Sequence, residues 1–189
     1  MNPTRTFDFI HFQNENFPQD KAFGYKYNGQ WKYFSSSEII NLANNLSSGL
    51  LKLGVKKGDK IALATYQNRP EWTIVDIAIQ QIGAINVPVY PTISAKEYEY
   101  IFNDAGVSIV FVGKDDLFDK VKSAQKSVPS LQHIITLDPN NQAPHWLSIS
   151  EPPNLETLKS LKSSITEDEL ATIIYTSGTT GNPKGVMLS

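Results

Sequence analysis

The segment YTSGTTGNPKGVMLS, residues 175–189, concentrates more phosphate-binding chemistry than any other part of the chain. It follows a mostly apolar run at residues 170–174. The stretch 176–185 holds three glycines, four hydroxyl side chains and one lysine: Gly178, Gly181, Gly185, Thr176, Ser177, Thr179, Thr180 and Lys184. Glycines let backbone N–H groups approach an oxyanion, hydroxyls donate further hydrogen bonds, and lysine adds positive charge. The composition predicts an anion-binding loop at the end of a strand.

The spacing excludes two common motifs. A Walker A loop needs Gly, four residues and then Gly-Lys followed by Ser or Thr. Here Pro183 stands five positions after Gly178, and Gly185 follows Lys184. A GxSxG nucleophile elbow needs glycine two residues before the serine, where this chain has Tyr175. We therefore interpret Ser177 as a hydrogen-bond donor and not as a nucleophile.

Composition and charge limit the remaining classes of function. The chain has 189 residues, 40% of them hydrophobic, which is enough for one large domain or two small ones. Its 17 basic and 19 acidic residues leave a net charge of −2, without the basic excess of nucleic-acid-binding proteins. The absence of cysteine excludes disulfides and a thiol nucleophile within this chain. Three scattered histidines, without metal-ligand spacing, argue against a metallohydrolase.

The first third of the chain carries clear turn and cap signals. Asn28-Gly29 separates two aromatic, strand-like runs, which predicts a β-hairpin over residues 22–35. Ser35 with Glu38, and later Ser94 with Glu97, form the S-x-x-E pattern of a capping box. Pro70 occupies the place of a first helical residue. These signals predict helices that begin shortly after residues 35, 69 and 94.

Strand-like and helix-like patterns alternate from residue 36 to residue 137. Such alternation predicts an α/β fold: a mostly parallel sheet with helices on both faces, preceded by the N-terminal hairpin. Pro88, within the expected strand 84–90, predicts an edge position or a bulge. We expect four parts, a hairpin, an α/β unit, a surface linker, and a strand with the phosphate-binding loop: 22–35, 36–137, 138–154 and 168–189.

The sequence resembles a known superfamily. TSGTTGNPKG, residues 176–185, fills every position of [ST]-[SG]-G-[ST]-T-G-x-P-K-G, the signature loop of the adenylate-forming (AMP-binding) superfamily. NRPEW at 68–72, GAINVPVYPT at 83–92 and IFNDAG at 101–106 resemble long-chain fatty acid CoA ligases. The resemblance implies part of the large N-terminal domain of an acyl-CoA synthetase. The three shorter stretches read as a helix start, a strand and a helix end, so we assign no chemistry to Arg69 or Tyr90.

The resemblance also implies chemistry. Members of the superfamily join a carboxylic acid to ATP, release pyrophosphate, and pass the acyl group from acyl-AMP to CoA. It implies that Lys184 is catalytic, stabilising charge on the phosphates, and that Thr176 helps to hold Mg²⁺. The ATP-binding residues would be Thr176, Ser177, Gly178, Thr179, Thr180, Gly181 and Lys184. The expected cofactors are thus ATP, Mg²⁺ and CoA, with CoA held mainly by parts that this chain does not contain.

Several alternatives stay open at this stage. The adenine, ribose and hinge motifs of the superfamily find no match here, so we expect an N-terminal fragment that is inactive alone. The substrate could be an aryl or amino acid in place of a fatty acid, or the chain could be a non-catalytic structural or interaction module. We expect a cytoplasmic protein with no nucleic-acid partner and no integral membrane segment. Peripheral membrane association and a homodimer are left open.

Overall fold

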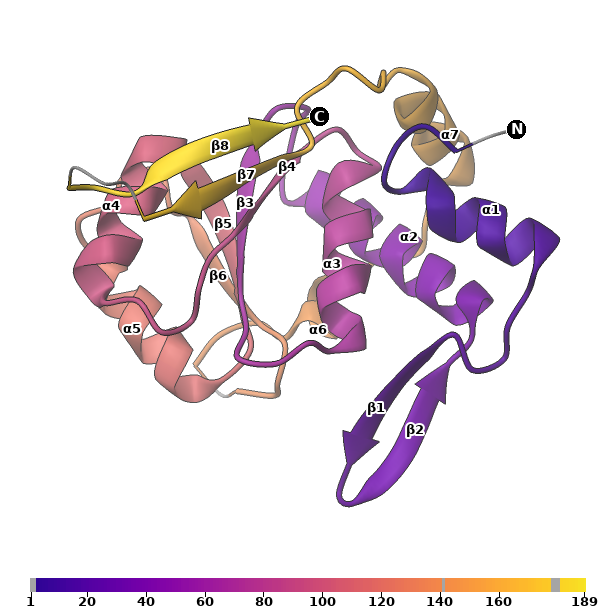
Figure 1. The fold of residues 1–189 in the computed structure, drawn as a ribbon, viewed down its shortest axis with the longest axis horizontal. Helices are drawn as coiled ribbons and strands as arrows, with labels where there is room; N and C mark the ends of the chain where they lie inside the picture. Colours follow the sequence, from indigo (N-terminus) through magenta and orange to yellow (C-terminus); the bar gives the residue numbers. More distant parts are fainter. Residues whose placement is uncertain (1–2, 141, 178–180) are drawn as a thin grey trace.

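The computed structural model describes residues 3–140, 142–177 and 181–189. Its main feature is a six-stranded sheet in the order β6-β5-β3-β4-β7-β8, beside a separate two-stranded sheet of β1 and β2 (Figure 1). The strands are β1 (Phe23–Tyr27), β2 (Gln30–Phe34), β3 (Lys60–Ala64), β4 (Ile85–Pro88), β5 (Val107–Val112), β6 (His133–Thr136), β7 (Thr172–Thr176) and β8 (Lys184–Leu188). The helices are α1 (Asp8–Asn16), α2 (Ser36–Lys52), α3 (Pro70–Gln80), α4 (Ala95–Ala105), α5 (Asp115–Gln125), α6 (Trp146–Ile149) and α7 (Leu155–Ser163).

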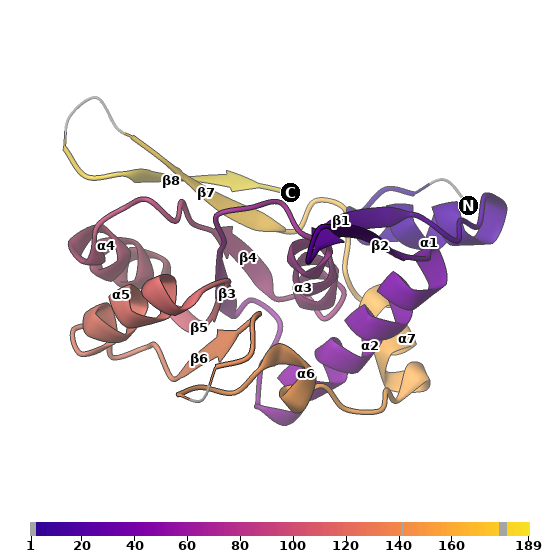
Figure 2. The same cartoon turned by 90° about the horizontal axis from the view of Figure 1, so that it is seen from below.

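The six-stranded sheet is mostly parallel. Its neighbouring strands pair in parallel from β6 to β7, and only β7 and β8 pair antiparallel. Helices pack on both faces, with α2 and α3 on one and α4 and α5 on the other (Figure 2). Each face has its own buried apolar cluster, because the inner strands are apolar on both sides. The predicted α/β class is therefore confirmed.

The predicted helix starts are also confirmed. Ser35 and Ser94 each accept a hydrogen bond from the backbone N–H of the glutamate three residues later, and that glutamate binds back to the serine N–H. Both arrangements are complete capping boxes, which satisfy backbone donors that a helix start leaves unpaired. Pro70 is the first residue of α3. Local sequence thus determines where three of the four main helices begin.

The N-terminal hairpin forms where the sequence predicts it. Asn28 and Gly29 both have positive φ, 48° and 81°, as a two-residue turn of the I′ type requires. The turn sets a register in which Tyr27 pairs with Gln30 and Phe23 with Phe34. Phe23 and Phe34 pack against the core cluster of α2 and α3, so the hairpin is anchored at its base.

Pro88 departs from our expectation. It lies at the end of β4, which is an interior strand between β3 and β7, so the predicted edge position is wrong. The N–H of Asn86 points to β7 and donates to the carbonyl of Ala171, and the N–H position of residue 88 faces the same side. Because the pairing of β4 with β7 is limited to Asn86 and Thr172, the missing donor of Pro88 falls beyond the last pair.

The segment 138–154, expected to be a surface linker, connects β6 to α7 but has a buried anchor. It contains α6, whose first residue, Trp146, is only 4% exposed. The N–H of Glu151 donates to the carbonyl of Asn45 on α2, at 3.0 Å. The segment 138–154 therefore packs against the core through Trp146 and binds α2 through Glu151.

Helix α1 has no counterpart among the predicted elements. It contains no buried residue, so it lacks the apolar periodicity by which a packed helix is recognised. Its position is fixed from just outside the helix: Phe7 is 2% exposed, and the Arg5 guanidinium binds the Asp8 carboxylate and the carbonyl of Ile165.

Candidate functional site

The predicted anion-binding loop joins two antiparallel strands. β7 leads into the loop at the carboxyl end of the parallel strands, and β8 leads out of it (Figure 1). The register places Thr176, the last residue of β7, directly opposite Lys184, the first residue of β8. Both side chains are exposed. The strand pair therefore brings a hydroxyl and an ammonium group to the two bases of one loop, at the edge where α/β sheets bind ligands.

The other predicted site residues lie between these two. Ser177 and Gly181 are exposed, and Gly181 has a φ of 115°, a conformation that favours glycine. Gly178, Thr179 and Thr180, which the sequence also assigns to the phosphate site, lie outside the described residues. The structure thus brings together Thr176 and Lys184 across the strand pair, with Ser177 next to Thr176 along the chain.

Tyr175 ties the base of the loop to the rest of the fold. Its side chain is 6% exposed, and its hydroxyl donates a hydrogen bond of 2.5 Å to Oδ2 of Asp104, in the last turn of α4. Burial, together with this bond to a carboxylate, raises the pKa of Tyr175. Sequence reasoning missed this contact because 71 positions separate the two residues and neither shows an unusual local pattern.

Gly185 is the cross-strand partner of Tyr175, and little room remains beside it. A Cβ atom added at Gly185 would lie 2.8 Å from Cγ2 of Ile173 and 3.1 Å from Cζ of Tyr175. Because residue 185 is a glycine, the Tyr175 ring can lie across the strand pair and pack over it. Such packing of an aromatic ring over a cross-strand glycine stabilises a sheet.

We expect Gly185→Ala to lower the free energy of unfolding by about 1–2 kcal/mol, because Ile173 or the Tyr175 ring must move. Urea denaturation of the variant and of wild type would measure the change. Gly29→Ala provides a comparison in which the strain has another cause. Gly29 has a positive φ, which disfavours a side chain, but no atom lies within 4 Å of the added Cβ. Unfolding that is unaffected by Gly185→Ala would contradict the close packing described here.

Two other polar side chains near the carboxyl ends of the strands, those of Arg69 and Tyr66, are paired with carboxylates. Arg69 forms ion pairs with Glu71 and Asp138, both at 2.9 Å, which link the start of α3 to the end of β6. These carboxylates raise the pKa of Arg69 in spite of its partial burial. Tyr66 donates to Asp116 at 2.5 Å. The ion pairs of Arg69 thus join the start of α3 to the end of β6.

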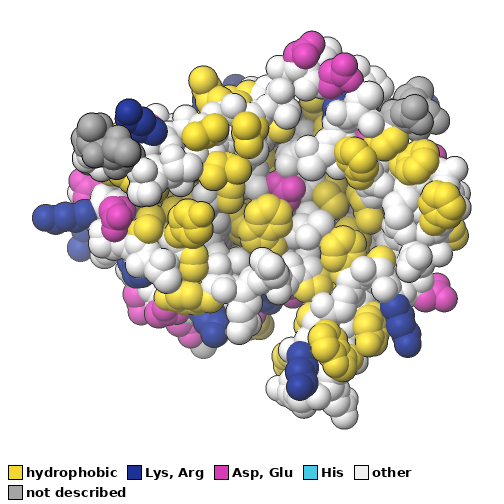
Figure 3. Space-filling model, in the orientation of Figure 1, with side chains coloured by type: hydrophobic (Ala, Val, Ile, Leu, Met, Phe, Trp, Pro, Cys, Tyr) yellow, Lys and Arg dark blue, Asp and Glu magenta, His cyan; other side chains and the backbone are white. Residues whose placement is uncertain are grey.

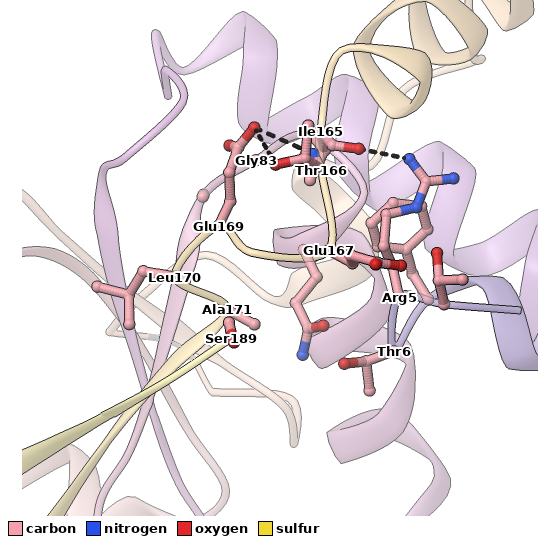
Figure 4. A pocket seen from close by; sticks show the side chains of 14 residues that line it. Arg5, Thr6, Gly83, Ile165, Thr166, Glu167, Glu169, Leu170, Ala171 and Ser189 are labelled. Carbon is pink, nitrogen blue, oxygen red and sulfur yellow. Dashed lines mark hydrogen bonds between the residues drawn. The ribbon is translucent and has the colours of Figure 1, made fainter.

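A small cavity lies at the other end of β7 (Figure 4). It encloses about 60 Å³ beside Leu170 and Ala171, which precede the strand. Two of its polar contacts link lining residues to one another: Arg5 donates to the carbonyl of Ile165, and the backbone N–H of Thr166 donates to Glu169. The cavity is separate from Thr176 and Lys184 and offers little room for a ligand.

No group of three or more His, Asp or Glu side chains among the described residues is arranged to hold a metal ion. None of the described helices has the length and apolar character needed to cross a bilayer.

Comparison with known proteins agrees with the predicted family and fold. The model of the AMP-binding enzyme family matches residues 10–189. The long-chain-fatty-acid–CoA ligase FadD15 of Mycobacterium bovis is 32% identical over 173 residues, covering 85% of this chain and 27% of that protein. The chain therefore spans about a quarter of the length of this curated relative.

Two solved structures show the same architecture. A putative long-chain-fatty-acid CoA ligase from Rhodopseudomonas palustris has a TM-score of 0.79 at 25% identity, over 98% of this chain and 44% of its own. The anthranilate CoA ligase AuaEII has a TM-score of 0.72 at 22% identity, over 94% and 34%. At 22% identity, the similarity to AuaEII concerns the fold alone. With a family match over nearly its whole length, the chain belongs to the AMP-binding enzyme family.

Proposed function

We propose that residues 176–184 form the loop that binds the ATP phosphates in an acyl-CoA synthetase, which adenylates a fatty acid and transfers it to CoA. The observation that carries this proposal is the pairing of Thr176 with Lys184 at the carboxyl end of the sheet. The similarity to fatty acid CoA ligases supports the choice of substrate class.

The chemistry of the site follows from where charge develops. Carboxylate attack on the α-phosphate places growing negative charge on the departing pyrophosphate, and donors fixed in advance lower the barrier. Lys184 would supply a positive charge at one base of the loop, while the hydroxyls of Thr176 and Ser177 would donate hydrogen bonds from the other. Because Tyr175 is buried and bonded to Asp104, β7 would hold these donors in place.

Magnesium fits this arrangement. A single neutral hydroxyl such as that of Thr176 suits an ion that binds few protein ligands and otherwise takes water and phosphate oxygens. When bound, Mg²⁺ would neutralise phosphate charge beside Lys184. CoA would enter only in the second half of the reaction, and we assign it no residue of this chain.

Pyrophosphate release with different carboxylic acids would test this proposed function. The gene product in its full length should release pyrophosphate from ATP with palmitate, and more slowly with aryl or amino acids. Release only with an aryl or amino acid would keep the adenylation chemistry and overturn the fatty acid. No release with any acid, from a folded protein, would favour a non-catalytic module.

A further inference from the structure

The β1–β2 hairpin projects away from the rest of the fold (Figure 1). Its base is held by Phe23 and Phe34, which pack against the core. Beyond this base most of its residues are exposed on both faces of the two strands. A two-stranded ribbon with so little burial is only marginally stable by itself, so the hairpin depends on its packed base. Its exposed side chains are available for another contact.

Large aromatic side chains cover the exposed part of this hairpin. Trp31 is 63% exposed, Tyr27 54% and Tyr33 44%. Trp31 and Tyr33 stack with their ring centroids 6.4 Å apart, and both lie over Gly24, whose missing side chain leaves room for them. The Trp31 and Tyr33 rings thus form an apolar surface on one face of the hairpin, and Tyr27 lies on the other face. Hydrophobic side chains are visible on the hairpin in the space-filling view (Figure 3).

The charge of the hairpin is of one sign. Residues 21–35 contain three lysines and no carboxylate, although the whole chain has a net charge of −2. The Lys21 ammonium lies 5.0 Å from the centre of the Tyr33 ring, and that of Lys32 lies 4.6 Å from the centre of the Tyr27 ring. Lys26 stands opposite Trp31. Cationic and aromatic groups therefore alternate over one exposed element.

We propose that this hairpin docks on a membrane surface that contains anionic phospholipid. Tryptophan and tyrosine are enriched at the level of the headgroups, where one end of the ring is apolar and the other is wet. Lysines beside them are attracted to anionic headgroups. The inference is independent of the proposed enzymatic function.

The lysines favour a lipid surface over a protein partner. The cores of protein interfaces are depleted in lysine, whereas a membrane interface accommodates lysines in contact with phosphate. The hairpin also keeps two strand edges with unpaired backbone groups, which cannot enter the hydrocarbon region. The contact would therefore be shallow, at headgroup depth, with the base of the hairpin still packed on α2 and α3.

The experiment is sedimentation of the purified chain with large unilamellar vesicles of phosphatidylcholine alone or with one quarter phosphatidylglycerol. We expect binding to the anionic vesicles, weakened by added salt because the attraction is screened. Lys26→Gln with Lys32→Gln should lower the partition coefficient about twenty-fivefold, at about fivefold for each lysine. Trp31→Ala should lower it about tenfold through the lost apolar contact.

Matched variants outside the hairpin serve as controls. Tyr90 is 66% exposed, and Lys56 and Lys126 are exposed lysines, so Tyr90→Ala and Lys56→Gln with Lys126→Gln remove similar groups elsewhere. Circular dichroism would establish that every variant is folded. Equal losses from hairpin and control variants would overturn the proposal, as would absence of binding to anionic vesicles. Self-association through Trp31 without vesicle binding would also overturn it and would assign the hairpin to a second copy of the chain.

Discussion

Replacing Lys184 with alanine is expected to lower kcat/KM for ATP-dependent pyrophosphate release by about a hundredfold to a thousandfold in the full-length gene product. Removal of one fixed donor to a developing negative charge typically has an effect of this size. Lys184 is exposed at the first position of β8, and its backbone pairing with Thr176 does not require the side chain. The variant should therefore fold normally while it loses transition-state stabilisation.

Two further variants test whether the effect depends on the positive charge of Lys184 itself or on the net charge of the protein. Lys184→Arg keeps the positive charge with a different geometry and should retain part of the activity. Lys126→Ala removes an exposed lysine at the end of α5 and should leave the rate unchanged. Steady-state kinetics with ATP as the varied substrate would measure all three. An unchanged rate in Lys184→Ala would remove this lysine from the proposed chemistry.

The parts of the fold that could be predicted from sequence are those determined by neighbouring residues. The Asn28-Gly29 turn depends on two residues that tolerate positive φ, and the caps at Ser35 and Ser94 depend on residues three positions apart. The alternation of strands and helices follows from local apolar patterns. None of these signals needs information from a distant part of the chain, so the hairpin, the helix starts and the parallel sheet were predicted correctly.

The features that sequence reasoning missed depend on distant partners. Pro88 is accommodated in an interior strand because β7 pairs with β4 only at Asn86, a fact of tertiary pairing. The polar segment around Trp146 shows no helical pattern in the sequence, yet Trp146 is buried because it packs against the core. The strand β8 was not expected after Lys184, because its five residues are all exposed and show no burial alternation. Its partner β7 determines its conformation.

Gly49→Ala should destabilise the fold by about 2–3 kcal/mol, although alanine is intrinsically the better residue in a helix. Gly49 lies in the interior of α2 and is buried against the end of α6. An added Cβ would lie 2.0 Å from the carbonyl oxygen of Ile149 and 3.2 Å from Cα of Ser150. These are backbone atoms, so the strain cannot be relieved by turning a flexible side chain, and α6 must move as a unit.

Movement of α6 is opposed at both of its ends, which is why we expect a loss larger than the gain in helix propensity. Trp146 anchors the start of α6 in the core, and the N–H of Glu151 binds Asn45 just after its end. Urea denaturation should show the lower stability, and tryptophan fluorescence should report greater exposure of Trp146. Asn41→Ala, at an exposed position of the same helix, should change the free energy of unfolding by less than about 0.5 kcal/mol. A similarly small change in Gly49→Ala would mean that α6 can shift at little cost and that its contact with α2 does not hold the connection in place.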